Sequence, residues 1–520
     1  MKSFMKYDET KDVLISTDHH AFIQKKMDYL SFHLTSCSRD DMANLQKMYF
    51  DLVCFVHEKM ASCSSYSIYL QSLYNITCFT RDCNGGKGLR DVSYMMICCI
   101  YTRFPHLAFQ LIYMLPYIGS WADIKYFCWF VREFDRGFDR GFDFEPLITY
   151  AVDIIVYQFH SDYLTWDEAF NAYLKNTSSL KRPCARELIS FAAKWIPREK
   201  NKHGYLFDMI VDRYFTLFEP FVTFSVRKMK FRKMVSTLSR ELDVLQRKMC
   251  TLNWASIDCK NVSLGSFMKF RSALLHGRSY YTNAIDRDLC REFMMDTLLY
   301  DNDGSDSASS KKLNVHMGKL VSLGFDLIHK PYDRTVMSQM AFVNNIWKKI
   351  VGKHCYCKSH SLLPILDSSI DVDKHAWFDM IGMSLLFARV SFLKRILVFR
   401  NNECITMPID ENADFIDLLR AFVDFEASVY VDFNACLQNL YRGFHFLNTH
   451  VKLVYVSTSS RILDSLKTFD CFTHKHIGYV FWNVQTSGFD ECLLEQFEPA
   501  RDQGVAFLSG STPNLLSTLS

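Results

Sequence analysis

The residues with the clearest chemical potential lie in LLPILDSSIDVD, from Leu362 to Asp373. A short apolar run ends there in oxygen-bearing side chains at alternate positions, Asp367, Ser369 and Asp371. Buried strands of open α/β sheets end in this way, and such sheets place their ligands at the carboxyl edge. The spacing therefore predicts a loop of oxygen ligands that follows a strand.

A second kind of chemistry, recognition of phosphate, is indicated by RKMKFRKM at residues 227–234. Its cationic side chains surround Phe231 and are Arg227, Lys228, Lys230, Arg232 and Lys233. Cations neutralise phosphates with release of counterions, and an aromatic ring can stack on a base. Two further basic segments supply Arg81, Lys87 and Arg90, and Lys194, Arg198, Lys200 and Lys202. If the helices curl into a ring, these residues could face one opening; the alternative is that they form solvated helix faces.

The segment RDCNGGKGLRD contains Gly85, Gly86 and Gly88 beside Lys87. A glycine-rich basic loop before a helix could cradle a phosphate. No strand precedes it, however, and it matches neither of the common nucleotide-binding glycine motifs. The segment is therefore predicted to be a turn between two helices.

Another short segment, HCYCKSH, brings four metal-binding residue types together: His354, Cys355, Cys357 and His360. The cluster is tight and lacks the second pair of ligands that known zinc sites supply. We therefore interpret it as a linker, with a zinc site as the alternative.

The sequence contains no motif of a known catalytic centre. It has no nucleophile elbow, no H-E-x-x-H zinc motif, no P-loop, and no Cys-His pair within a known catalytic signature. We therefore expect a protein that is not an enzyme.

Composition limits the class of protein. The chain has 520 residues, of which 49% are hydrophobic and 22% charged, and its net charge is +3. These values predict a packed protein of several domains, and the net charge alone does not indicate nucleic-acid binding. The 18 cysteines are scattered through apolar segments, which favours reduced thiols in the cytoplasm. A polar N-terminal segment and the lack of a long uncharged run argue against a signal peptide and a membrane span.

The periodicity of apolar residues changes near residue 360. Residues 1–355 show helical spacing in one segment after another, which suggests a helical-repeat solenoid, with a flexible loop expected at 301–312. Residues 356–520 alternate between strands and helices, which predicts a doubly wound, mostly parallel sheet. The expected strands are 362–366, 395–399, 451–458, 476–484 and 504–510, and the expected helices between them are 377–390, 413–425, 433–443 and 460–469.

The chain resembles the DUF2828 family, which includes proteins of giant DNA viruses. The segments that carry the resemblance are RDCNGGKGLRD, LPYIGSWADIKYF, FAAKWIPRE, FRKMVSTLSRELDVLQRKMCTLNWASID, PILDSSID, YVFWNV and GVAFLSGSTPNLL. The resemblance implies a HEAT-like helical region related to TROVE modules, followed by a von Willebrand factor A domain. This architecture is distantly similar to that of the Ro autoantigen, a helical ring closed by such a domain that binds small noncoding RNA. It also implies a possible viral origin.

The resemblance further implies a metal-ion-dependent adhesion site, which suits Mg²⁺ and an incoming carboxylate. The family pattern is Asp-x-Ser-x-Ser, and Asp367 and Ser369 match it while Asp371 replaces the second serine. Val431, just before Asp432, takes the place of a threonine ligand, and Ser457-Thr458 takes the place of an acid. The implied ligands are thus Asp367, Ser369, Asp371 and Asp432. The alternative is a vestigial loop in which Asp367 and Ser369 cap the next helix or satisfy backbone donors.

Together these features predict an RNA- or ribonucleoprotein-binding scaffold that is not an enzyme. The helical region would contact a small structured RNA, and the A domain would close the ring or bind a protein partner. Two alternatives remain: a protein-interaction module that uses a degenerate adhesion site, and a structural viral component without a metal.

Overall fold

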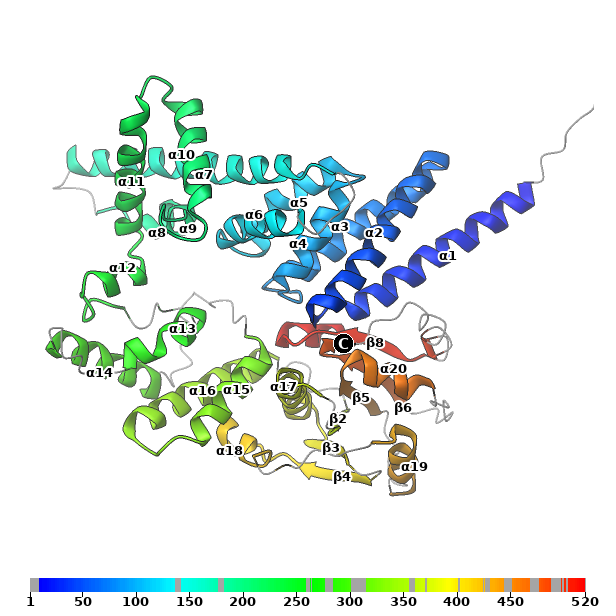
Figure 1. Ribbon diagram of the computed structural model, residues 1–520. Helices are drawn as coiled ribbons and strands as arrows, with labels where there is room; N and C mark the ends of the chain where they lie inside the picture. The colour runs from blue at the N-terminus through cyan, green and yellow to red at the C-terminus, as the bar shows by residue number, and fades with distance from the viewer. Residues whose placement is uncertain are drawn as a thin grey trace, which may run out of the picture. The chain divides into compact units, whose positions relative to one another are not determined.

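The computed structural model shows a chain of helices followed by a region of alternating strands and helices (Figure 1). The structure describes residues 9–135, 142–175, 182–258, 262, 264–275, 284–300, 315–354, 361–369, 372–400, 403–423, 425, 431–443, 451–467, 477–487, 497, 500–501 and 504–519. The predicted loop at 301–312, three of the four HCYCKSH ligands and Asp371 lie outside these residues. No helix in the described part is long and apolar enough to span a membrane.

The chain divides into two compact units. The first comprises Met1–Val92 and Asn314–Ser520, and the second comprises Ser93–Leu313. This division differs from the boundary predicted between residues 355 and 356, because the first helices and the helices after residue 314 join the strands in one unit.

A six-stranded mixed sheet forms the centre of the first unit. Its strands, in spatial order, are β4 (Glu403–Pro408), β3 (Arg395–Arg400), β2 (Leu362–Asp367), β5 (Val451–Ser457), β6 (Ile477–Asn483) and β8 (Ala506–Ser509). Among them β4 pairs with β3 in antiparallel fashion, and the other pairs are parallel. The prediction of an α/β region with a mostly parallel sheet is confirmed, whereas β4 was not predicted. Because β2 comes first in this part of the chain yet lies in the middle, the strand order reverses between β2 and β5.

Helices cover this sheet. Helix α17 (Lys374–Val390), of which 13 of 17 residues are buried, packs on β2, β3 and β5, and α15 (Met317–Ile328) packs on α17. A Cβ atom at Gly382 would lie 2.8 Å from that of Met317, so this crossing requires glycine. The other described α-helices after residue 314 are α16 (Arg334–His354), α18 (Phe415–Arg420), α19 (Phe433–Gly443) and α20 (Ser459–Lys467).

The first helices of the chain pack in the same unit as its last strands. These helices are α1 (Glu9–His33), α2 (Arg39–Ser62) and α3 (Ile68–Arg81). Strand β1 (Ser36–Cys37) pairs in parallel with β7 (Gln485–Thr486), and α1 contacts β8. The Asn483 amide also donates to the carbonyl of Phe32 at 2.9 Å. The two ends of the chain therefore build one core.

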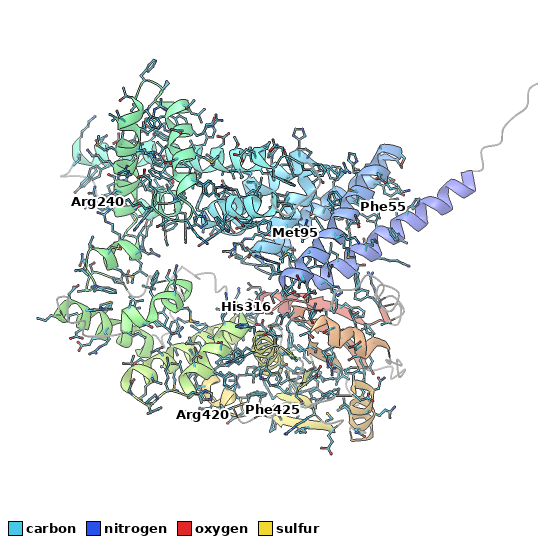
Figure 2. The ribbon with its side chains drawn as sticks, viewed as in Figure 1. Phe55, Met95, Arg240, His316, Arg420 and Phe425 are labelled. Carbon is cyan, nitrogen blue, oxygen red and sulfur yellow. The ribbon has the colours of Figure 1, made fainter. Side chains whose placement is uncertain are left out.

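The second unit consists of helices in its described part. They are α4 (Arg90–Tyr101, from Ser93 onward), α5 (Pro105–Ile118), α6 (Ala122–Asp135), α7 (Glu145–Lys175), α8 (Ala185–Leu188), α9 (Ala192–Trp195), α10 (Gly204–Phe218), α11 (Phe224–Glu241), α12 (Leu245–Cys250), α13 (Leu264–Leu275) and α14 (Ala284–Tyr300). Side chains fill the space between successive helices, and Met95, labelled in Figure 2, is fully buried. The prediction of a helical region is confirmed.

Candidate functional sites

Asp367 lies at the end of β2 and is completely buried. One carboxylate oxygen accepts hydrogen bonds from the backbone N–H of Ser369 at 3.0 Å and from the Ser369 hydroxyl. The other accepts from the Tyr455 hydroxyl at 2.8 Å and the Ser457 hydroxyl at 3.1 Å. Tyr455 and Ser457 belong to β5, the neighbour across the point where the strand order reverses. The loop therefore sits where α/β sheets commonly bind ligands.

A cation of the chain itself reaches this carboxylate. Arg461, on α20, places its Nε 3.3 Å from Asp367 and donates through Nη2 to the carbonyl of Val431 at 3.3 Å. Burial and the neighbouring Asp367 raise the pKa of Tyr455 well above its ordinary value, so its phenol stays protonated and continues to donate. The buried negative charge is thus neutralised and hydrogen-bonded within the protein, as a buried charge requires.

The described residues of the predicted metal site do not fit a magnesium ion. The Oδ2 atom of Asp367 already accepts from three donors: the hydroxyls of Tyr455 and Ser457 and the Arg461 guanidinium. Asp432 accepts the backbone N–H groups of Asn434 and Ala435, and so caps α19. Among the described residues, no group of three His, Cys, Asp or Glu side chains could hold a metal. The geometry favours the alternative in which Asp367 and Ser369 satisfy protein donors.

The first basic segment does not form a phosphate site. Lys87 is only 4% exposed, and its ammonium donates to the carbonyls of Ser31 (2.6 Å) and Leu34 (2.9 Å) and to the Ser509 hydroxyl (2.6 Å). Its predicted role in RNA binding is wrong for this conformation, because a buried ammonium with three acceptors cannot meet a phosphate. Arg81 is likewise buried.

The glycines between Arg81 and Arg90 form the predicted interhelical turn. The N–H groups of Lys87 and Gly88 donate to the carbonyls of Phe79 and Asp82, and Gly88 has a φ of 69°. The Asp82 carboxylate accepts the N–H groups of Asn84 and Gly85. These donors close the turn, so they cannot also cradle a phosphate. Arg90, at the start of α4, is paired with Asp91 at 2.9 Å.

The second and third basic segments lie beside each other in the second unit. Glu199 pairs with Lys228 at 3.1 Å and with Arg232 at 3.2 Å, and so connects α11 to the segment after α9. Other cations of α11 also have partners: Lys228 pairs with Asp208, Lys230 pairs with Glu219, and Arg227 donates to the carbonyl of Val222. Lys233 is exposed.

Phe231 cannot stack on a base. It is fully buried, with its ring centroid 4.9 Å from that of Phe159 and 5.4 Å from that of Tyr214. The predicted contact with RNA is therefore wrong for this residue. It anchors α11 to the core of the second unit.

Cations lie over aromatic rings along α6 and the segment that follows α9. Lys125 lies 4.7 Å from the ring centroid of Trp195, and Lys202 lies 4.9 Å from that of Trp129. We call this region the α6–α9 surface and define it by Lys125, Trp129, Lys194, Trp195, Arg198, Lys200 and Lys202. Arg198, Lys200 and Lys202 are exposed. Lys125, Trp129 and Trp195 were not predicted, although the four-residue spacing of Lys125 and Trp129 places these two on one face of α6.

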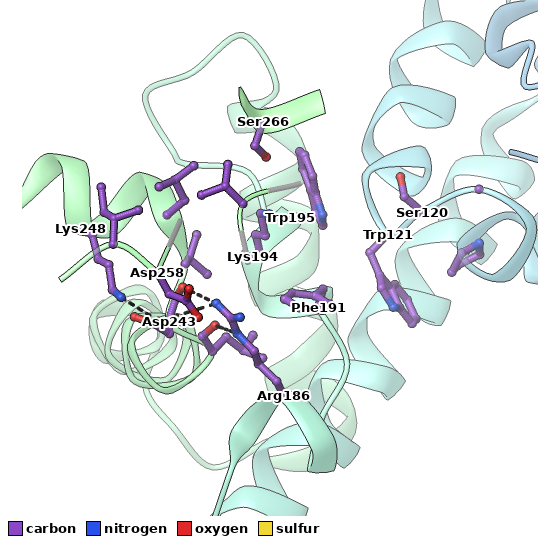
Figure 3. Close-up of a pocket in the computed structure, with 17 residues that line it drawn as sticks. Ser120, Trp121, Arg186, Phe191, Lys194, Trp195, Asp243, Lys248, Asp258 and Ser266 are labelled. Carbon is purple, nitrogen blue, oxygen red and sulfur yellow. Dashed lines mark hydrogen bonds and ion pairs between the residues drawn. The ribbon is translucent and has the colours of Figure 1, made fainter. Parts of the chain in front are cut away.

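A cavity of about 430 Å³ adjoins this surface and shares Lys194 and Trp195 with it (Figure 3). Trp121 and Phe191 also line it, and Arg186 and Lys248 line it from the other side (Figure 3). Its volume falls in the range of small-molecule sites, roughly 300–1,000 Å³. The cavity was not predicted, because its lining residues come from five separate segments of the sequence.

Lys194 differs from the other two cations of this cavity. Arg186 donates to the carbonyls of Leu242 (3.1 Å) and Asp243 (3.0 Å), and Lys248 pairs with the Asp243 carboxylate at 2.8 Å. The Lys194 ammonium lies over the rings of Trp195 and Phe191, at 5.3 and 5.7 Å, and has no oxygen acceptor among the described residues. Burial, followed by the charge of Arg186, lowers the pKa of Lys194. Among the three cations of the cavity, Lys194 is thus the one that an anionic ligand can pair with.

No family model, curated protein or solved structure matches the chain. The resemblance to the DUF2828 family therefore stays a prediction, and a function has to be inferred from the sites themselves.

Proposed function

We propose that the chain is an RNA-binding scaffold, not an enzyme, and that the α6–α9 surface contacts the RNA. The observation that carries this proposal is the interleaving of cations with aromatic rings on one surface, as in Lys125 over Trp195 and Lys202 over Trp129. Single-stranded nucleic acids bind such surfaces, because the cations follow the phosphates and the rings stack on bases. The partner that fits is a small RNA with unpaired bases.

We further propose that the second unit is a HEAT-like or TROVE-like array and that the sheet region is a von Willebrand factor A-like domain. The reversal of strand order at β2 and the Asp-x-Ser loop that follows it support the second assignment. In this proposal the domain serves as a structural or protein-binding part without a metal, because Arg461 neutralises Asp367.

Charge reversal of the exposed cations of the α6–α9 surface should weaken RNA binding. The triple variant Arg198→Glu, Lys200→Glu and Lys202→Glu is expected to lose roughly ten- to a hundredfold in affinity for a labelled stem-loop RNA. The slope of log K against log salt should become shallower by about 2–3, because up to three phosphate contacts are lost. Fluorescence anisotropy of the full chain at several salt concentrations measures both quantities.

The matched control reverses three exposed lysines of the first unit: Lys47→Glu, Lys319→Glu and Lys330→Glu. It changes the net charge by the same amount and should retain most of the affinity. If both triple variants bind equally well, the α6–α9 surface is not the RNA site. If the unmodified chain binds no RNA at low salt, the proposed function is wrong.

A further inference from the structure

The cavity beside the α6–α9 surface has two chemically different walls. One wall is aromatic and contains Trp121, Phe191 and Trp195 (Figure 3). The other carries the polar side chains of Arg186, Asp243 and Lys248 (Figure 3), and the lining also includes the aliphatic residues Leu242, Val244, Leu245, Ile257 and Val262. A ligand with a flat apolar face on one side and polar groups on the other fits this lining.

The polar wall is held in place before any ligand arrives. Asp243 follows the end of α11 with a φ of 52°, an unusual value for a residue with a side chain. Its carbonyl accepts from Arg186 and its carboxylate accepts from Lys248, which also donates to the carbonyl of Ser256 at 2.5 Å. Such mutual hydrogen bonds lower the cost of ordering the side chains when a ligand binds.

The charges of the cavity match a ligand with a single phosphate. Three cations and two carboxylates line the cavity, a net charge of +1. Arg186 and Lys248 both pair with the carboxylate of Asp243, whereas Lys194 has no oxygen partner among the described residues. A second carboxylate, that of Asp258, also lines the cavity and disfavours polyanions. Lys194 stands beside Trp195, so a phosphate on the ammonium would lie next to an aromatic face.

We propose that this cavity binds one unpaired nucleotide, with its base against Trp121 and Trp195 and its phosphate on Lys194. The inference rests on the proposed RNA-binding function and names the element of the RNA that the second unit recognises. Stacking on an aromatic side chain contributes about 1–3 kcal/mol per base in single-stranded nucleic acids.

Two chemical features distinguish this ligand from other occupants. A duplex cannot enter, because its bases are stacked and paired and only its backbone is accessible. A nucleoside without phosphate would stack on the aromatic wall and leave Lys194 unpaired, whereas inorganic phosphate would pair with Lys194 and leave the aromatic wall empty. Both should therefore bind more weakly than the nucleoside monophosphate.

The test is a titration of the full chain with uridine 5′-monophosphate and adenosine 5′-monophosphate, followed by tryptophan fluorescence. Binding should quench the emission, and the matching nucleosides and inorganic phosphate should bind at least about tenfold more weakly. In Lys194→Met the nucleotide should bind no better than the nucleoside. The exposed lysine Lys233 of α11 provides the matched control, since Lys233→Met should leave nucleotide binding unchanged.

A second measurement separates this inference from the proposed function. Trp121→Leu should weaken binding of an RNA with unpaired bases and leave the weaker binding of a blunt duplex unchanged. One outcome would overturn the cavity inference and leave the proposed function standing. In that outcome the full chain binds RNA, mononucleotides do not quench its tryptophan emission, and the Trp121→Leu and Lys194→Met variants bind RNA normally. If mononucleotides bind and RNA does not, the proposed function is wrong and the cavity is a nucleotide site.

Discussion

Replacement of Asp367 by asparagine is expected to lower the free energy of unfolding of the first unit by about 3–5 kcal/mol. The substitution keeps the shape of the side chain and removes its charge, so the partly buried Arg461 guanidinium loses the carboxylate that neutralises it. The amide also cannot accept from Ser369, Tyr455 and Ser457 as the carboxylate does. Chemical denaturation followed by circular dichroism measures the loss.

Asp373 provides a control of the same chemistry in the same loop. It is exposed and caps α17 by accepting the N–H of His375 at 2.8 Å. Asparagine is an equally good helix cap, so Asp373→Asn should change the stability by less than about 0.5 kcal/mol. If Asp367→Asn costs no more than Asp373→Asn, the Asp367 network does not stabilise the fold.

Addition of Arg461→Met to Asp367→Asn tests whether the arginine takes the place of a metal. The double variant should recover part of the loss, because no unpaired charge then remains in the site. The melting temperature of the unmodified chain should be the same in Mg²⁺ and in a chelator. A clear stabilisation by Mg²⁺ that Asp367→Asn abolishes would mean that a metal displaces Arg461, contrary to this assignment.

Lys87→Met is expected to destabilise the same unit by about 2–4 kcal/mol at neutral pH. The carbonyl of Leu34 loses its Lys87 donor, and the carbonyl of Ser31 keeps only the Ser509 hydroxyl, which donates to it at 2.9 Å. Lys47→Met, at an exposed position of α2, is the control and should change the stability by less than about 0.5 kcal/mol. An equal effect of the two substitutions would contradict the structural role of Lys87.

The pH dependence of stability gives a second signature of Lys87. Burial lowers its pKa to about 7, against about 10.4 in an unfolded chain. Between these values the unfolded chain holds a proton that the folded chain has lost, so the free energy of unfolding rises with pH by up to about 1.4 kcal/mol per unit. Below pH 7 the lysine is charged in both states and this dependence disappears.

The difference in stability between the unmodified chain and Lys87→Met isolates this effect from other titrating groups. It should grow as the pH rises from 7 to 10 and stay level between pH 5 and 6. If the free energy of unfolding of the two proteins changes with pH in the same way from pH 5 to 10, Lys87 remains protonated in the folded state, held by its three acceptors.

Strands and helices of the sheet region follow from local sequence. The predicted strand at 362–366 corresponds to β2 (Leu362–Asp367), and the one at 395–399 corresponds to β3 (Arg395–Arg400), because continuous apolar runs mark strands buried on both faces. Strand β4 lies at the edge of the sheet and is mostly exposed, so its sequence ECITMP carries no such run. The pairing of β1 with β7 joins two residues to two residues far along the chain, a contact that no local pattern indicates.

The candidate sites were predictable only where a motif marks them. The spacing of Asp367 and Ser369 located the loop correctly, but a single arginine in SSRILDSLK gives no sign that it will reach Asp367. Lys87 and Phe231 were assigned by residue type, whereas their roles follow from burial. Phe231, Met234 and Leu238 recur at helical spacing along α11, and this signal could have placed Phe231 in the core.

The joining of the two ends of the chain in one unit has a consequence for synthesis on the ribosome. Lys87 and Ser509 lie 422 residues apart, so at about 5–20 residues per second roughly 20–80 seconds separate their emergence. During that time the helical unit from Ser93 to Leu313, continuous in the chain, can fold, while α1 has neither β8 nor the Asn483 amide to pack against. Helices α1 to α3 are therefore made long before the strands that they pack against, and a nascent chain arrested before β6 should leave them open to protease.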